Sequence, residues 1–263
     1  MASRTLLGIP ADISCRPFRD ALRSAGGFEL VLDGPASLAQ RLEHGKLNGA
    51  LLSPIDYARN ASDYLIVPGS AVSSQSGNES LVIHFRRGVK TVRTLAVQPM
   101  SASDIILAKI LLAERFDIEP RIMPVEGTLE SMLEKADAAL LAGDAALGSV
   151  TDRPEALDLV EEWIGATDLP YVHGFWCARG HMLTKPEWTL LGGLADRLDG
   201  PAGEAEGRQP GETFSYDFPE NVQEGIREFL RYAYYHGILP DVPDLRFFGS
   251  SDEEEDRAYP PSN

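Results

Sequence analysis

Near the start of the chain, residues 5–18 have the sequence "TLLGIPADISCRPF". A short apolar run there is followed by small and hydroxylated residues and then by an arginine and a proline. Such a run, bounded by turn residues, is typical of a buried strand, and Pro17 suits the first turn of a helix. Open α/β sheets commonly bind ligands where strands end. Residues 8–18 are therefore expected to form either one wall of a ligand site or a plain turn.

Short apolar segments alternate with amphipathic ones after this opening. The alternation favours an α/β fold with largely parallel sheets. Strands are expected at 5–9, 28–32, 49–53, 64–68, 80–85, 94–97, 121–125 and 138–142, and helices at 35–45, 101–116 and 219–236. In the second of these helices Ser101 is placed to cap the N-terminus, with Asp104 as the acidic partner of a capping box.

The bulk composition excludes several classes of function. A formal net charge of -16 over 263 residues argues against nucleic-acid and anionic-membrane surfaces, because both need clustered cations. No apolar run is long enough to span a bilayer, and no secretory signal is recognisable, so a cytoplasmic protein is expected. The two cysteines, Cys15 and Cys177, are expected to pack in the core. The loop 199–211 and the acidic tail 250–263 are expected to be solvated or disordered.

Several common catalytic signatures are missing from the sequence. It contains no glycine-rich phosphate loop, no G-x-S-x-G elbow and no Cys or His cluster with metal-ligand spacing. Neither a metal nor an organic cofactor is therefore expected.

Hydroxyl groups and small residues recur at the ends of the expected strands. Taken singly, each serine is a cap or turn residue; taken together, they would line a cleft of neutral donors suited to a small carboxylate. Asp144 either caps a following helix or lines that cleft, and His173 faces either the core or the cleft. The candidates are Ser14, Ser53, Ser80, Ser101, Ser103, Gly143, Asp144 and His173.

Five motifs resemble one family, the chorismate dehydratases of the futalosine route to menaquinone. They are "DISCRPF", "LAQRLEHGKLNGALLSPIDYAR", "GNESLVIHFRRG", "ADAALLAGDAAL" and "DLVEEWIGATDLPYVHGFWCAR", which together span residues 8–180. The last two are the most specific.

The resemblance implies a two-lobed fold like that of type II periplasmic binding proteins, with a cleft between the lobes and a two-strand hinge. "SLVIHFRRG" would carry the chain into the second lobe and "YVHGFWCAR" would bring it back. The first lobe is then expected to comprise residues 1–86 and 181–263, including the 219–236 helix, and the second lobe residues 87–180.

The resemblance also implies an activity: a cofactor-free hydro-lyase that dehydrates chorismate to 3-[(1-carboxyvinyl)oxy]benzoate. Ser80 falls on the family's active-site serine, and Ser14 stands where the family has an asparagine that serves catalysis. Ser103 keeps a hydroxyl at the entry to the second-lobe helix, where Ala102 replaces a threonine.

A chorismate-like carboxylate is expected to be bound by the other candidates, in a monomer or homodimer with no nucleic-acid or membrane partner. These candidates are Ser53, Ser101, Ser103, Gly143, Asp144 and His173. The alternative is a divergent paralogue that binds or converts another small aromatic or cyclic carboxylate.

Overall fold

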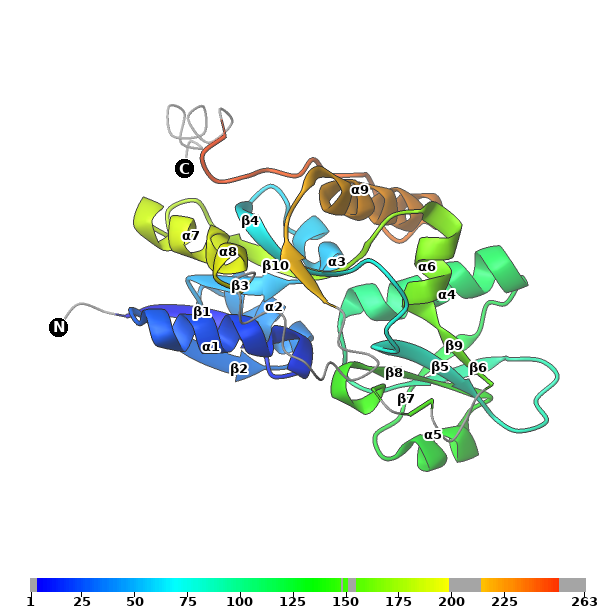
Figure 1. Cartoon of the computed structure of the whole chain (residues 1–263). Helices are drawn as coiled ribbons and strands as arrows, with labels where there is room; N and C mark the ends of the chain where they lie inside the picture. The colour runs from blue at the N-terminus through cyan, green and yellow to red at the C-terminus, as the bar shows by residue number, and fades with distance from the viewer. Residues whose placement is uncertain (1–3, 148, 151–154, 199–213, 251–263) are drawn as a thin grey trace.

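In the computed structural model, which describes residues 4–147, 149–150, 155–198 and 214–250, the chain forms two β-sheets with helices packed around them (Figure 1). The loop 199–211 and all but the first residue of the tail 250–263 lie outside the described residues. Within the described part, no helix is both long enough and apolar enough to cross a membrane.

The first sheet has the strand order β11-β4-β10-β3-β1-β2. Strands β1, β2 and β3 are mutually parallel, whereas β10 runs antiparallel to both β3 and β4. The strands are β1 (Thr5–Pro10), β2 (Phe28–Asp33), β3 (Gly49–Leu52), β4 (Leu65–Ser74), β10 (Tyr171–Ala178) and β11 (Ser215–Asp217). The helices of this lobe are α1 (Arg16–Ala25), α2 (Pro35–Glu43), α3 (Pro54–Ala58), α7 (Lys185–Gly192) and α8 (Leu194–Leu198).

The second sheet has the order β7-β6-β8-β5-β9, with β5 antiparallel to both of its neighbours. Its strands are β5 (Leu81–Phe85), β6 (Thr94–Val97), β7 (Arg121–Pro124), β8 (Ala138–Ala142) and β9 (Ala156–Asp158). Its helices are α4 (Ala102–Phe116), α5 (Leu129–Lys135) and α6 (Leu159–Thr167). A last helix, α9 (Glu220–Tyr235), packs against β10 and α3 and also touches α4 of the second lobe.

All eight expected strands are present as β1 to β8, and the three expected helices are α2, α4 and α9. The expectation of largely parallel sheets was wrong, because both sheets are mixed. Most antiparallel pairings involve β5, which follows the first passage between the lobes, or β10, which follows the second; β11 also pairs antiparallel with β4. A chain that enters a sheet from the side of the other lobe runs against the strands built by βαβ crossovers.

The chain passes between the sheets earlier than the expected boundaries at 86 and 180. One passage lies between Ser74 and Leu81 and the other between Thr167 and Tyr171. Strand β5 pairs with β8 in the second sheet, and β10 pairs with β3 and β4 in the first. The boundaries are therefore corrected, since strands belong to the sheet in which their backbone hydrogen bonds are made.

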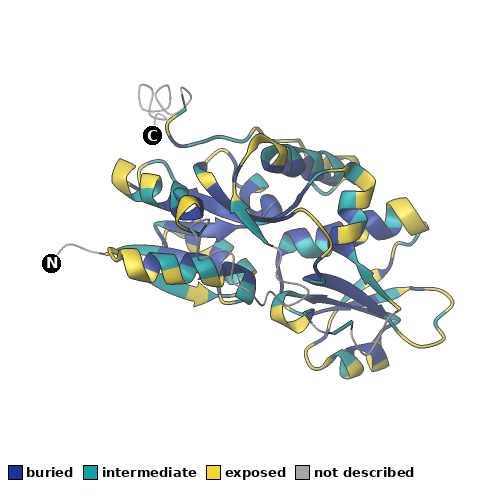
Figure 2. Cartoon of the chain, viewed as in Figure 1, coloured by how far each residue is buried: buried dark blue, intermediate teal, exposed yellow. Residues whose placement is uncertain are grey.

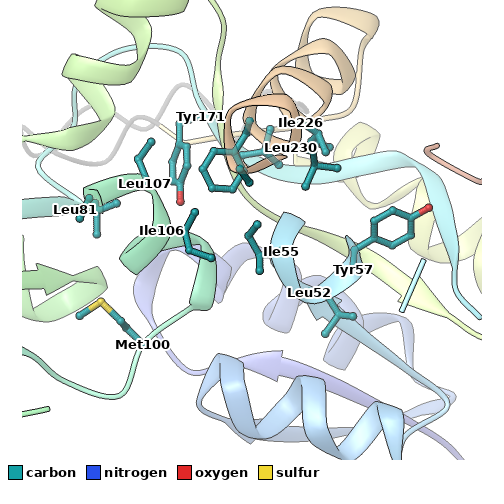
Figure 3. Packing of buried hydrophobic residues seen from close by; sticks show 14 of the residues in the cluster. Leu52, Ile55, Tyr57, Leu81, Met100, Ile106, Leu107, Tyr171, Ile226 and Leu230 are labelled. Atoms are coloured by element: carbon teal, nitrogen blue, oxygen red, sulfur yellow. The ribbon is translucent and has the colours of Figure 1, made fainter. Parts of the chain in front are cut away.

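The two lobes share an apolar core. Ile55 of α3 lies beside Ile106 of α4, and the same buried cluster includes Leu107 of α4 and Ile226 of α9 (Figure 3). The inner strands of both sheets are largely buried, whereas the edge strands β2, β7, β9 and β11 and the outer faces of the helices are more exposed (Figure 2). Burying an Ile or Leu side chain stabilises a fold by about 1.5–3 kcal/mol. This shared packing stabilises the contact between the lobes.

Candidate functional site

A cavity of about 480 Å³ lies between the lobes. It is built at the carboxyl ends of β1, β2 and β3 in the first sheet and of β6 and β8 in the second, where the turns leading out of these strands meet. Its principal lining residues are Pro10 to Cys15, Asp33, Gly34, Pro35, Ser53, Ser80, Pro99, Met100, Ser101, Asp104, Ala142 to Ala145, His173, Gly174 and Phe214. The opening stretch of the chain therefore forms one wall of a cavity rather than only a turn.

Most of the serines and the other candidates meet at this cavity. Ser14, Ser53, Ser80, Ser101, Gly143, Asp144 and His173 all line it. Ser103 does not line the cavity: it is fully buried between α3 and α4, and its Oγ accepts a hydrogen bond of 3.0 Å from the backbone N–H of Ile55. The expectation that Ser103 contacts a ligand is corrected, because its hydroxyl faces the first helical turn of α3.

Ser80 is held by Asn78, a buried residue in the segment that joins β4 to β5. The hydroxyl of Ser80 donates to Oδ1 of Asn78 at 2.6 Å, and the amide group of Asn78 donates to Oγ of Ser74 at 2.8 Å. Ser74 in turn shares a 2.8 Å hydrogen bond with Nε2 of His173. A continuous chain of hydrogen bonds thus connects Ser80 and His173, both of which line the cavity.

His173 is an uncharged group in this setting. Burial lowers its pKa to about 4, so the imidazole is neutral near pH 7. Its ring lies edge to face against Tyr171 and Phe214, with centroids 4.9 and 5.3 Å apart. His173 therefore faces the cleft, as one of the two sequence alternatives proposed, and it offers hydrogen bonding rather than positive charge.

Ser14 lies in a single 3-10 turn, Ile13–Cys15, between β1 and α1. Its hydroxyl donates to the carboxylate of Asp12. The guanidinium of Arg19 donates to the backbone carbonyls of Pro10 and Asp12, at 2.8 and 2.7 Å, and so fixes the turn. Cys15 is buried, which raises its thiol pKa well above the ordinary value, and this agrees with the expected packing role.

Asp144 lies two residues after the end of β8 and connects the two lobes. Its Oδ1 accepts a 2.8 Å hydrogen bond from the backbone N–H of Ile13 in the first lobe. The neighbouring Gly143 has a φ of +58°, and a Cβ at this position would lie 3.3 Å from Cβ of Asp12. Asp144 thus lines the cavity and bridges the lobes. The structure shows no side-chain cap on its short 3-10 turn.

Ser53 and Ser101 combine capping with a place on the cavity wall. Ser53 caps α3, accepting from the backbone N–H of Asp56 and donating to its carboxylate at 2.7 Å. Ser101 caps α4 and accepts from the backbone N–H of Ser103 at 3.2 Å. Each of these two serines therefore caps a helix and also lines the cavity.

Asp104 was expected only as a capping partner, and the structure gives it a different contact. Its Oδ1 accepts a 2.9 Å hydrogen bond from the hydroxyl of Tyr171 on β10, across the junction of the lobes. Burial raises the pKa of this carboxyl to about 7. Neither Asp104 nor Asn78 was among the candidate residues. Asn78 lies two residues before Ser80 in the motif "GNESLVIHFRRG", which was the signal that could have identified it, whereas Asp104 is placed at the cavity by tertiary packing.

The charged side chains on the cavity wall are all acidic. They are Asp12, Asp33, Asp104 and Asp144; among the described lining residues there is no lysine or arginine. A carboxylate ligand would therefore be held by hydroxyls, backbone groups and helix ends rather than by a counter-ion.

Two α/β lobes with a ligand-sized cavity at their facing strand ends define a periplasmic-binding-protein-like fold. Solved structures with a similar fold support this class. The chain aligns with a protein from Archaeoglobus fulgidus (TM-score 0.65, 17% identity, 90% of this chain and 98% of the other). It also aligns with the alkanesulfonate-binding protein SsuA of Xanthomonas axonopodis pv. citri (TM-score 0.60, 15% identity, 93% and 96%).

Within that class the sequence places the chain more narrowly. Residues 5–190 match the family model for menaquinone biosynthesis, and the chain belongs to this family. Over 191 residues it is 28% identical to a chorismate dehydratase of Thermus thermophilus, an alignment that covers 66% of this chain and 69% of the relative. The family resemblance of the sequence motifs is confirmed.

Proposed function

We propose that this chain is a cofactor-free lyase that dehydrates chorismate to 3-[(1-carboxyvinyl)oxy]benzoate in the futalosine route to menaquinone. One observation carries the proposal: in a chain of the menaquinone biosynthesis family, Ser80, Ser14 and five other candidate residues face a single interlobe cavity. The similarity to a chorismate dehydratase supports the substrate.

The reaction asks little of the protein in the way of reactive groups. The hydroxyl on the ring carbon beside the enolpyruvyl ether leaves as water, and the ether-bearing carbon loses a proton, so the ring becomes aromatic. The substrate's own enolpyruvyl carboxylate can accept this proton. Holding the substrate so that the two groups are aligned then supplies much of the rate enhancement.

The hydrogen-bond directions at Ser80 favour a contact with a substrate hydroxyl. Because the Ser80 proton is donated to Asn78, its oxygen lone pairs are left to accept from the cavity. A hydroxyl on the ring can donate such a hydrogen bond, and a carboxylate cannot. We assign Ser80 to the leaving hydroxyl, and Ser14 to the position where the family asparagine bonds the substrate.

The other groups serve binding in this proposal. Ser101, at the N-terminal end of the 15-residue α4, lies where the helix end favours a substrate carboxylate. Ser53 lies on the same cavity wall. Gly143, Asp144 and His173 complete the wall, with neutral His173 offering a hydrogen bond. Ser103 supports this arrangement from behind by holding α3 against α4.

The test is incubation of the purified protein with chorismate, following substrate loss and product appearance by chromatography. We expect conversion, and a decrease of about 100-fold or more in kcat for Ser80→Ala, the scale of losing an oriented transition-state hydrogen bond. Ser131→Ala is a matched control, since Ser131 lies on α5 and donates to the carbonyl of Thr128. Turnover by Ser80→Ala within a few-fold of the unchanged protein would contradict the assignment.

The charge of the cavity favours a second candidate, a divergent paralogue acting on a less charged cyclic or aromatic carboxylate. Asp12, Asp33 and Asp144, with no lysine or arginine among the described lining residues, disfavour a doubly charged substrate. Thermal unfolding with chorismate and with benzoate distinguishes the two. Stabilisation by benzoate alone, without chorismate turnover, would support the paralogue.

We also propose that the chain works in the cytoplasm, as a monomer or homodimer. Cys15 and Cys177 are both buried free thiols, a state that a reducing compartment preserves. Cell fractionation and the mass of the purified protein in solution test these two points.

A further inference from the structure

We infer that Asp104 is the acid that protonates the departing hydroxyl of the substrate. The inference rests on the proposed dehydration and adds a catalytic residue to it. Asp104 lies on the cavity wall at the first turn of α4, and the hydroxyl of Tyr171 occupies its Oδ1. Its second oxygen is then left to carry a proton toward the cavity.

The other carboxyls on the wall are committed as acceptors. Asp12 accepts from Ser14, and Asp144 accepts from the backbone of Ile13. Asp33 accepts from Ser37 and lies 3.1 Å from the guanidinium of Arg41, and its pKa is lowered mainly by the hydrogen bond from Ser37. These contacts at Asp33 favour its ionised form. Asp104 is the wall carboxyl whose surroundings favour the neutral form.

Burial and two neighbouring carboxylates favour the neutral form of Asp104. Burial raises the pKa of Asp104 to about 7, and the charges of Asp12 and Asp56 add to the rise. The Tyr171 hydroxyl acts in the opposite direction, because it donates to the carboxyl. A carboxylic acid with a pKa near the working pH both holds a proton and releases it, which is the property a general acid needs.

The elements packed around α4 carry several charged and titratable groups. On α9, Arg227 pairs with Glu220 and Glu224, and Arg231 pairs with Glu224 and Glu228. Near Asp104 lie Asp12, Asp56 with Arg59 at 3.6 Å from it, Tyr171 and neutral His173; at the far end of α4 lie the pairs Arg115–Glu162 and His236–Glu114, each at 2.9 Å. Arg115 lies at the opposite end of this 15-residue helix and is paired with Glu162. The groups next to Asp104 are mainly acidic or neutral, and they favour the protonated form of its carboxyl.

The proposed step balances. The bond between the ring carbon and the hydroxyl oxygen breaks with its electrons on oxygen, which takes the Asp104 proton and leaves as water. The hydrogen on the ether-bearing carbon passes as a proton to the enolpyruvyl carboxylate, and its bonding electrons complete the aromatic ring. Asp104, now a carboxylate, regains a proton from that carboxyl group or from solvent.

The decisive variant is Asp104→Asn, in which the amide oxygen still accepts from Tyr171 but no proton can be given. We expect kcat to decrease by about 100-fold or more, the usual scale of general acid catalysis, with KM changed by less than about threefold. In the unchanged protein kcat should decrease as the pH rises through about 7, and the variant should lose this dependence. Asp117→Asn, the same exchange on an exposed residue beyond the end of α4, is the matched control.

A second variant keeps the inference testable if Asp104→Asn folds poorly. Tyr171→Phe removes the hydrogen bond that favours the ionised carboxyl, so the decline in kcat should move to higher pH. Carboxyl ¹³C NMR of aspartate-labelled protein should show one signal that titrates near pH 7 and is absent in Asp104→Asn.

The outcomes separate the two proposals. Turnover by the unchanged protein together with an unaltered kcat and pH profile in Asp104→Asn would overturn the role of Asp104 alone. No chorismate turnover by the unchanged protein would overturn the proposed function and this role with it.

Discussion

Asn78 accepts a hydrogen bond from the hydroxyl of Ser80 at 2.6 Å and donates one to the hydroxyl of Ser74 at 2.8 Å. One side chain thus links Ser74, at the end of β4 in the first sheet, to Ser80, which precedes β5 of the second. Asn78 sits in the passage between β4 and β5, where the chain leaves the first sheet. The orientation of Ser80 is therefore set by a residue that belongs to the junction of the lobes rather than to either sheet.

Asn78→Ala should lower kcat for chorismate by about tenfold, because Ser80 loses the acceptor that orients it and about 1.4 kcal/mol corresponds to that factor. Asn78→Asp separates the two contacts: it still accepts from Ser80 but cannot donate to Ser74. Steady-state kinetics of both variants, with Asn60→Ala as a control outside the cavity, measure the effect. Equal activity in all three variants would contradict a positioning role for Asn78.

Ser103→Ala should destabilise the protein without weakening ligand binding. It leaves the buried backbone N–H of Ile55 without its acceptor, a loss of about 1–3 kcal/mol in the free energy of unfolding. Denaturant unfolding and the KM for chorismate check the two halves of this prediction. A stable variant with a strongly raised KM would show instead that Ser103 contacts the ligand.

Gly143→Ala should destabilise the protein, because it crowds the contact between Gly143 and Asp12 of the other lobe. The left-handed φ of +58° costs an alanine about 1–2 kcal/mol, and its Cβ would lie 3.3 Å from Asp12. Gly45→Ala is a control with the same backbone cost, since Gly45 has a φ of +66° and its Cβ would meet nothing within 4 Å. Any further loss of stability or ligand binding in Gly143→Ala measures the contact with Asp12.

The pH dependence of stability should carry the signature of Asp104. Burial raises its pKa to about 7 in the folded chain from an ordinary value of 3.8, so the folded state binds more protons between these two pH values. Its contribution to the free energy of unfolding is fully present below about pH 4 and is lost as the pH rises through about 7, with a slope of at most about 1.4 kcal/mol per pH unit.

The difference between the unchanged protein and Asp104→Asn isolates that contribution from other groups. His173 acts in the opposite direction, because its pKa is lowered to about 4, so its contribution is lost as the pH falls from about 6.5 to 4. Chemical unfolding at several pH values between 4 and 8 gives the comparison. A difference that does not change with pH would mean that Asp104 has an ordinary pKa.

Much of the fold could be read from local pattern. The run 5–9 and the other seven expected segments are strands in the structure. Each is a short apolar run bounded by turn residues, and a strand in the middle of a sheet buries such a run. The cap of α4 at Ser101 followed from the same kind of local signal. What local pattern could not settle was strand direction at β5 and β10, since that depends on which sheet supplies the hydrogen-bonding partner.

The sequence by itself determined the α/β class, the family and a set of hydroxyls at strand ends, because apolar periodicity, caps and motifs are properties of neighbours along the chain. Only the tertiary structure decided which of these meet: it placed Ser80 at the cavity and Ser103 behind it. It also brought Tyr171 to Asp104 from 67 residues away and raised the pKa of that carboxyl. Burial and long-range hydrogen bonds set these properties, and neither is encoded in any short stretch of residues.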